Sequence, residues 1–207
     1  MYSGITRGLF PVVEVSREPG LVRYAVDLGA ELSAGLSLGA SVAIDGVCQT
    51  VVALEGSRVR FDAIQETLDL TTLDTLTVGR QVSVERSLRV GDELGGHEVA
   101  GHVIGRGEIT ELAREGHDVS VRVRVPEAWM PYILPKGFIA VDGSSLTVGR
   151  TFTDGFTLHL IPETLRLTNF GTRQVGDLVN IELDPRTVAI VNTVERVLAA
   201  RLAQGAS

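Results

Sequence analysis

Two side chains that can act as nucleophiles occupy equivalent settings far apart in the sequence. Cys48 stands two residues before Thr50, and Ser145 stands two residues before Thr147. A thiol or hydroxyl group can add to an electrophilic carbon once a neighbouring base takes its proton. An isolated Cys or Ser is more often a small residue that fits a crowded core, but the matched settings strengthen the chemical interpretation. We therefore take Cys48 and Ser145 as candidate nucleophiles.

A histidine supplies a group that can move protons near neutral pH. His102 stands where the other half of the chain has Ile5, so only one half carries it. His97 lies five residues earlier, and an odd separation on a strand places two side chains on opposite faces. This is poor geometry for binding one metal ion. We expect no metal site.

These residues belong to a duplicated sequence. A shift of 97 residues aligns the two halves without a gap, and 16 of 48 positions are identical between 39–86 and 136–183. Glu66-Thr67-Leu68, for example, falls on Glu163-Thr164-Leu165. The duplication predicts two homologous domains, residues 1–97 and 98–184.

Within each half, the sequence pattern is that of strands. Val119, Val121 and Val123 alternate with polar residues, as in a strand that is buried on one face. The Asp-Gly pairs at 45–46 and 142–143 are strong signals for tight turns. We predict an all-β protein of two tandem, homologous, six-stranded, Greek-key-like β-barrels, followed by a C-terminal α-helix.

The segment 185–207 changes to a helical period and has no counterpart in the first half. Asp184 can cap a helix and Pro185 suits its first position. Apolar residues then recur at three- and four-residue spacing, at Val191, Val194, Leu198 and Leu202. We expect this apolar stripe to bury against other copies of the chain. The alternative is a helix that folds back over its own barrel.

Composition argues against several classes of function. The chain has 19 Lys plus Arg against 26 Asp plus Glu, a formal net charge of -7. This balance argues against nucleic acid as a partner, because such proteins bind phosphates through Lys and Arg. No apolar run approaches the roughly 20 residues of a membrane-spanning helix, and no signal-peptide pattern opens the chain. We expect no membrane partner and a cytoplasmic location.

Several motifs in a fixed order resemble riboflavin synthase of the alpha-subunit type. The similarity extends over nearly the whole chain, and the combination of separate motifs makes it highly specific. The motifs are Met1-Tyr2-Ser3-Gly4-Ile5, Asp45 to Val51, Gly95 to Val103, Lys136 to Gly143 with Ser145 to Val148, and Ile161 to Leu165.

The resemblance implies a homotrimer of two-barrel subunits that dismutates two molecules of 6,7-dimethyl-8-ribityllumazine. One molecule gives up a four-carbon unit and leaves as 5-amino-6-(D-ribitylamino)uracil, and the other becomes riboflavin. The resemblance implies no cofactor and no metal. It also implies that the first barrel of one subunit faces the second barrel of a neighbour. Association with lumazine synthase is left open.

The resemblance also implies two sets of substrate-binding residues, one for each barrel. The first pocket is expected to use Gly4, Ile5, Thr6, Cys48, Gln49, Thr50, Asp62, Ala63, Ile64, Gln65, Glu66 and Thr67. The second is expected to use Gly101, His102, Val103, Lys136, Ser145, Leu146, Thr147, Leu160, Ile161, Pro162, Glu163, Thr164 and Leu165. Lys136, Glu66 and Glu163 are expected to hold ribityl hydroxyls. The catalytic candidates, without individual roles, are Cys48, His102, Ser145 and Thr147.

The chain departs from the family pattern at five positions. Tyr2, Ser3 and Ala100 stand where Phe, Thr and Ser are usual. Ala100 lacks a hydroxyl that could form a hydrogen bond beside His102, so we expect reduced activity. Gln49 and Gln65 replace the usual Leu and Pro, and we assign neither a catalytic role.

Two other hypotheses compete with the enzyme. A non-catalytic lumazine- or flavin-binding protein on the same duplicated barrel would resemble the lumazine proteins of luminous bacteria, whose second half has drifted. Here the second half keeps Lys136, Ser145, Thr147 and His102, which favours the enzyme. A purely structural β protein would leave the matched Asp-Gly and Glu-Thr-Leu motifs unexplained.

Overall fold

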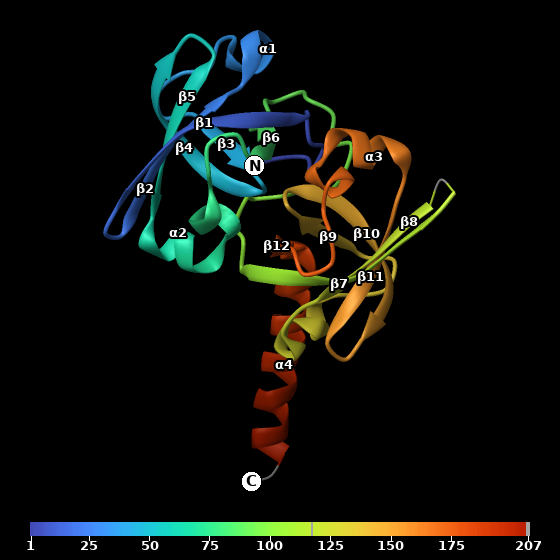
Figure 1. Cartoon of the computed structure of the whole chain (residues 1–207). Coiled ribbons are helices and arrows are strands. Elements are labelled where there is room, and N and C mark those ends of the chain that lie inside the picture. Colours follow the sequence, from blue (N-terminus) through green and yellow to red (C-terminus); the bar gives the residue numbers. More distant parts are fainter. Residues whose placement is uncertain (117, 206–207) are drawn as a thin grey trace.

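The computed structural model of the chain describes residues 1–116 and 118–205, and it contains two closed antiparallel barrels and one long helix (Figure 1). Each barrel has six strands, joined in the same cyclic order. The predicted architecture of two tandem six-stranded barrels with a C-terminal helix is confirmed.

The first barrel has the strand order β1-β2-β5-β4-β3-β6. Its elements are β1 (Leu9–Glu18), β2 (Leu21–Asp27), α1 (Gly29–Ser33), β3 (Ser41–Ile44), β4 (Val47–Glu55), β5 (Arg58–Ile64), α2 (Gln65–Leu70), the 3-10 turn η1 (Thr72–Thr75) and β6 (Gln81–Arg86).

The second barrel repeats this order with β7-β8-β11-β10-β9-β12. Its elements are β7 (Gly105–Glu115), β8 (Asp118–Arg124), η2 (Glu127–Tyr132), β9 (Phe138–Val141), β10 (Ser144–Phe152), β11 (Gly155–Leu160), α3 (Pro162–Leu167), η3 (Asn169–Gly171) and β12 (Leu178–Leu183).

The barrel interiors are filled by every second side chain of the strands. In β5, Val59, Phe61 and Ala63 are fully buried, whereas Asp62 and Ile64 between and after them are exposed. The valines of β8 are buried in the second barrel as their alternation predicts. Because strand side chains alternate between two faces, the outward set on each barrel is left free to build a site.

The two barrels meet at their Asp-Gly turns. Asp45 and Asp142 both have a φ of 45° and each is followed by a glycine with a φ of 80°, as tight hairpin turns require. A Cβ atom added to Gly46 would lie 2.3 Å from the backbone nitrogen of Gly143. Only glycine therefore permits the turns to pack back to back, so the glycine in each turn is needed for the barrels to dock.

Buried charges lie at this junction. The fully buried carboxylates of Asp45 and Asp142 pair with Arg80 at 2.8 Å and Arg173 at 2.6 Å, respectively. The amide nitrogen of Asn169 donates to both carboxylates, at 3.2 and 2.8 Å. Burial first, and then the charge of Asp142, raise the pKa of Asp45 to about 6. A network that shares one amide between two barrels stabilises a single relative orientation of them.

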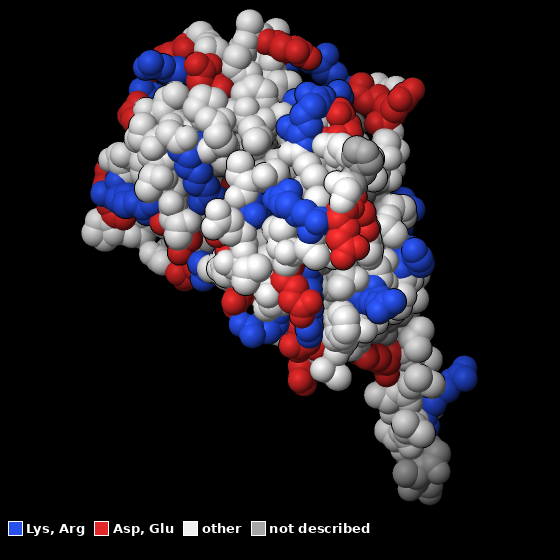
Figure 2. All heavy atoms as spheres, turned by 45° about the vertical axis from the view of Figure 1, so that its right-hand side comes forward, with Lys and Arg blue, Asp and Glu red and all other residues white. Residues whose placement is uncertain are grey.

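The C-terminal helix α4 (Pro185–Gly205) begins where the cap predicts and projects away from the barrels (Figures 1 and 2). Asp184 accepts hydrogen bonds from the backbone nitrogens of Arg186 and Thr187, both at 3.2 Å. Val188 packs against the second core, and the Tyr132 hydroxyl donates to Asn192 at 2.7 Å. Residues 206 and 207, the end of the predicted segment 185–207, lie outside the described residues.

Beyond its first turns, α4 does not cover its own barrel. Its apolar side chains are 46–75% exposed, namely Ile190, Val194, Val197, Leu198 and Leu202. The alternative in which the helix folds back over its barrel is therefore wrong. None of the helices in the described part of the chain is long and apolar enough to cross a membrane.

Candidate active site

Cys48 lies on the outer face of β4, just after the first Asp-Gly turn. Its neighbour Gln49 points into the barrel instead, where its side chain is 5% exposed and accepts a hydrogen bond from the Tyr24 hydroxyl at 3.2 Å. Thr50 is exposed again on the outer face. The strand alternation therefore separates these predicted binding residues, and only the backbone of Gln49 is available to a ligand on the outer side.

The sulfur of Cys48 is half-buried and has a tyrosine as its partner. The Tyr2 hydroxyl donates to the Cys48 Sγ at 3.2 Å. Burial, and then the contact with Cys48, raise the pKa of Tyr2 far above its usual range. Tyr2 therefore stays protonated and remains a hydrogen-bond donor to the sulfur.

A hollow of about 230 Å³ lies in front of Cys48, which we call the first-barrel site. It is lined by Val47, Cys48, Glu66, Thr67, Leu70, Thr71, Gly101, His102 and Val103. Glu66 and Thr67 come from α2, the helix that follows β5. His102 is exposed at this site, so a thiol and an imidazole border the same hollow.

The matching hollow in front of Ser145, of about 160 Å³, is the second-barrel site. It is lined by Gly4, Ile5, Thr6, Ser144, Ser145, Leu146, Glu163, Thr164, Leu167 and Thr168. A further hollow of about 460 Å³ adjoins it and shares Ile5, Thr6 and Leu167.

The structure corrects the predicted grouping of these residues. Gly4, Ile5 and Thr6 line the second-barrel site, although we expected them in the first pocket. Gly101, His102 and Val103 line the first-barrel site, although we expected them in the second. The reason is that the segment before each barrel crosses to the other barrel. The backbone nitrogen of Ser145 donates to the Gly4 oxygen at 2.8 Å, and that of Cys48 donates to the Gly101 oxygen at 2.9 Å.

Both crossings require glycine. Gly4 and Gly101 have φ values of +73° and +79°, which L side chains rarely adopt. A Cβ atom on Gly4 would lie 2.5 Å from the Ser145 Cβ, and one on Gly101 would lie 2.6 Å from the Cys48 Cβ. Each crossing segment therefore lies in backbone contact with the nucleophile of the opposite barrel.

A second histidine, which the sequence did not indicate as catalytic, lies against Ser145. The His97 Nδ1 and the Ser145 Oγ are 2.6 Å apart, and the ring stacks on Phe138 with centroids 5.1 Å apart. Burial lowers the pKa of His97, partly opposed by Asp184. Its Nε2 is buried without a hydrogen-bond partner among the described residues. A neutral ring with its proton on Nε2 can accept the Ser145 proton at Nδ1.

The remaining predicted residues fall into three groups. Asp62, Ile64, Gln65, Ile161 and Pro162 are exposed at the strand ends that lead into α2 and α3. Ala63 and Leu160 have side chains buried in the barrel cores, and Leu165 packs partly buried against the second core. Lys136 and Thr147 are exposed and do not line the hollows described above.

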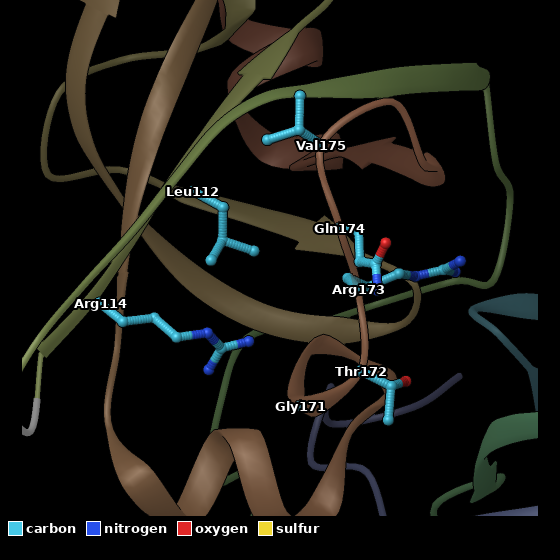
Figure 3. A pocket seen from close by; sticks show the side chains of 7 residues that line it. All are labelled: Leu112, Arg114, Gly171, Thr172, Arg173, Gln174 and Val175. Carbon is cyan, nitrogen blue, oxygen red and sulfur yellow. The ribbon is translucent and has the colours of Figure 1, made fainter.

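A larger hollow of about 570 Å³ lies apart from all these residues (Figure 3). It is bordered by Leu112, Arg114 and the stretch from Gly171 to Val175. Arg173 is already paired with Asp142. None of the predicted site residues lines this hollow, and we assign it no role.

The two sites are bordered by helices on different sides of one subunit. α2, which borders the first-barrel site, and α3, which borders the second-barrel site, lie on opposite sides of the molecule in Figure 1. The first-barrel hollow is smaller than the roughly 300–1,000 Å³ of typical ligand pockets, and the second-barrel hollow reaches that range only together with the hollow that adjoins it. In the described part of the chain, no cluster of three or more His, Cys, Asp or Glu could hold a metal ion.

Comparisons with known proteins agree with the duplicated two-barrel arrangement. The family model of the lumazine binding domain matches twice, at residues 3–87 and 100–184. Riboflavin synthase of Escherichia coli (strain K12) is 44% identical over 202 residues, which cover 97% of this chain and 95% of that protein. Riboflavin synthase of Brucella abortus (strain 2308) is 47% identical over 154 residues, covering 72% and 76% of the two chains.

The fold is also found among solved structures. The crystal structure of LumP complexed with riboflavin has a TM-score of 0.83 and 24% sequence identity, covering 89% of this chain and 100% of that chain. At this identity the likeness concerns the fold alone. The duplicated domain match and the full-length relatives show that the chain belongs to the riboflavin synthase family.

Proposed function

We propose that the chain is a riboflavin synthase that converts two molecules of 6,7-dimethyl-8-ribityllumazine into riboflavin and 5-amino-6-(D-ribitylamino)uracil. The observation that carries this proposal is the pair of equivalent sites, each with its own nucleophile and its own histidine. A reaction between two identical molecules requires two sites of similar shape. Their different side chains would let one molecule give the four-carbon unit and the other receive it.

The proposed chemistry uses the protein groups at each site. The C7 methyl group of one lumazine must lose a proton, and a nucleophile must add to the ring of the other. Ser145 with His97 would serve the second-barrel site, and Cys48 with Tyr2 and His102 would serve the first-barrel site. Thr147 and Thr50, exposed on the outer strand faces, would bond the polar ring edges. Both carbon fragments come from the substrate, so the proposal includes no cofactor.

The backbone at Lys136 supports its proposed contact with a ribityl chain. Lys136 has a φ of 65°, in the left-handed region, whereas its counterpart in the first barrel is Gly39 with a φ of 80°. A side chain in this conformation costs about 1–3 kcal/mol. A strained lysine where glycine would be unstrained is typical of a functional position. The exposed carboxylates of Glu66 and Glu163 would bond further ribityl hydroxyls.

We propose a homotrimer in which the first-barrel site of one subunit faces the second-barrel site of the next. Two features support this assembly: the helices α2 and α3 that border the two sites lie on opposite sides of one chain, and the first-barrel hollow of about 230 Å³ is smaller than a typical ligand pocket. Stacking two lumazines in one such site can lower the barrier by roughly 7–11 kcal/mol through proximity in the best cases. The domain limits near residues 97 and 184 and the cytoplasmic location belong to the same proposal. Association with lumazine synthase remains an expectation.

The test is incubation of the purified protein with 6,7-dimethyl-8-ribityllumazine as the only substrate. We expect riboflavin and 5-amino-6-(D-ribitylamino)uracil to form in equal amounts, because each turnover makes one of each. Chromatography of the products measures both. Tight binding of the lumazine without turnover would contradict the enzyme and favour the lumazine- or flavin-binding protein.

A further inference from the structure

Two buried carboxylates hold the crossing segments in place. Glu85, on β6, is 6% exposed and accepts hydrogen bonds from the backbone nitrogen and hydroxyl of Ser3, both at 2.7 Å, and from the Gly4 nitrogen at 3.0 Å. Glu182, on β12, is 5% exposed and accepts from the nitrogens of Ala100 at 2.7 Å and Gly101 at 2.9 Å. The two glutamates are 97 residues apart, so the duplication repeats the device.

Burial of these two carboxylates costs free energy that packing alone does not offset. Taking an ionised group out of water is unfavourable unless several donors compensate it, and burial raises the pKa of both glutamates against these hydrogen bonds. Hydrogen bonds from backbone N–H groups to a carboxylate are short and directional. Each glutamate accepts hydrogen bonds with both carboxylate oxygens, which fixes the position and the direction of the bound segment.

The two segments bound by Glu85 and Glu182 each line the site of the opposite barrel. Gly4 is bound on one side by Glu85 of its own barrel and on the other by the backbone of Ser145 in the second barrel. The residues that follow, Ile5 and Thr6, line the second-barrel site. The chain at Gly101 passes in the same way to Cys48 and lines the first-barrel site with His102 and Val103. The position of each wall is therefore set from the other barrel.

We propose that Glu85 and Glu182 are positioning residues that act crosswise: Glu85 of the first barrel shapes the second-barrel site, and Glu182 of the second barrel shapes the first-barrel site. This inference rests on the proposed function, because it takes both hollows as lumazine sites. Neither glutamate lines the first-barrel site or the second-barrel site, and neither is assigned contact with substrate. Glu85 borders a separate hollow of about 330 Å³ with Arg7 and Glu31.

The experiment measures lumazine binding to one site at a time. Thr67 and Thr164 are matched, half-buried residues of the first- and second-barrel sites. Thr67→Trp fills the first and Thr164→Trp fills the second, so that each variant keeps one site per chain. With one partner site filled, turnover stops, and the Kd of 6,7-dimethyl-8-ribityllumazine is measured at equilibrium by fluorescence titration. Glu85→Gln and Glu182→Gln are then added to each of the two variants.

We expect a crossed result. Gln offers one acceptor oxygen where Glu offers two, and its NH₂ group would face a backbone N–H. Glu85→Gln should weaken binding about tenfold in the Thr67→Trp chain, in which the second-barrel site is open, and less than about twofold in the Thr164→Trp chain. Glu182→Gln should show the reverse. The surface substitution Glu18→Gln, on β1 and away from both sites, should change neither Kd.

Three outcomes would overturn the inference. The first is a weakening at the site of the same barrel, and the second is equal weakening at both sites, as general loosening of the fold would give. The third is no change at either site. If a Gln variant does not fold, Glu→Asp at the same position keeps the charge, withdraws it from the segment and must give the same crossed pattern. If the parent chain binds no lumazine at all, the proposed function fails, and the two sites assumed here fail with it.

Discussion

Removal of residues 185–207 should convert the protein from an oligomer into single subunits and abolish turnover. α4 exposes Ile190, Val194, Leu198 and Leu202, and a contiguous apolar stripe of this kind usually marks an interface. In the full chain, light scattering should report a mass near three times 22.1 kDa. The truncated barrels should still fold, because each closes without the helix.

A point variant separates loss of the interface from loss of the helix. Leu198→Glu places a charge in the stripe but leaves Val188 and Asn192, the contacts of α4 with its own barrel, unchanged. It should lower both the mass and the turnover, whereas Arg196→Glu on the other face should change neither. An oligomer that survives the truncation, or a monomer with full activity, would show that α4 does not complete the site.

Ser145→Ala should lower kcat by a factor of about 10² to 10⁴, the usual effect of losing a positioned proton-transfer group. Among the described residues, the Ser145 hydroxyl is the only hydrogen-bond partner of the His97 ring. Equilibrium binding of the lumazine should change little, because alanine removes only one oxygen from a half-buried side chain. The melting temperature should fall, because loss of the hydrogen bond to the buried His97 ring costs about 1–3 kcal/mol.

The dependence of kcat on pH should reflect the protonation of His97. Burial lowers the pKa of His97 below its usual 6.5, so the ring stays neutral and able to accept a proton until the pH falls below about that value. The acidic decline of kcat should therefore lie below pH 6.5 and should vanish from the residual activity of His97→Gln. A Ser145→Ala variant within about twofold of the parent, or an unchanged acidic decline in His97→Gln, would contradict this pair.

The duplication made most of the fold predictable. Because one shift of 97 residues relates Asp45 to Asp142 and Cys48 to Ser145, equivalent turns and equivalent nucleophiles follow directly from the sequence. The identity of Glu85 and Glu182 under the same shift indicates that the two glutamates have equivalent roles, but it does not show which segment each one binds. The C-terminal helix was predictable because its apolar period differs from that of the strands.

The crossing itself could not be predicted, and the reason is general. A repeat shows which residues are equivalent, but equivalence is preserved whether a segment packs on its own barrel or on the other one. The repeat therefore does not show that Gly4 contributes to the second-barrel site and Gly101 to the first-barrel site. The repeat gives no signal for His97, because the shift of 97 residues places its counterpart before residue 1. The resemblance implies a ligand contact for Gln49, but strand alternation turns its side chain inward.

The central claim is that each active site is built from the first barrel of one subunit and the second barrel of another. Thr67→Trp and Thr164→Trp, each filling a different site, should both be inactive alone. Mixed trimers, made by refolding the two variants together, should regain turnover, with about a quarter of all sites in the refolded sample intact if the subunits assemble at random. Restored formation of riboflavin is the predicted result. Mixed trimers of confirmed composition that remain as inactive as the separate variants would contradict the account.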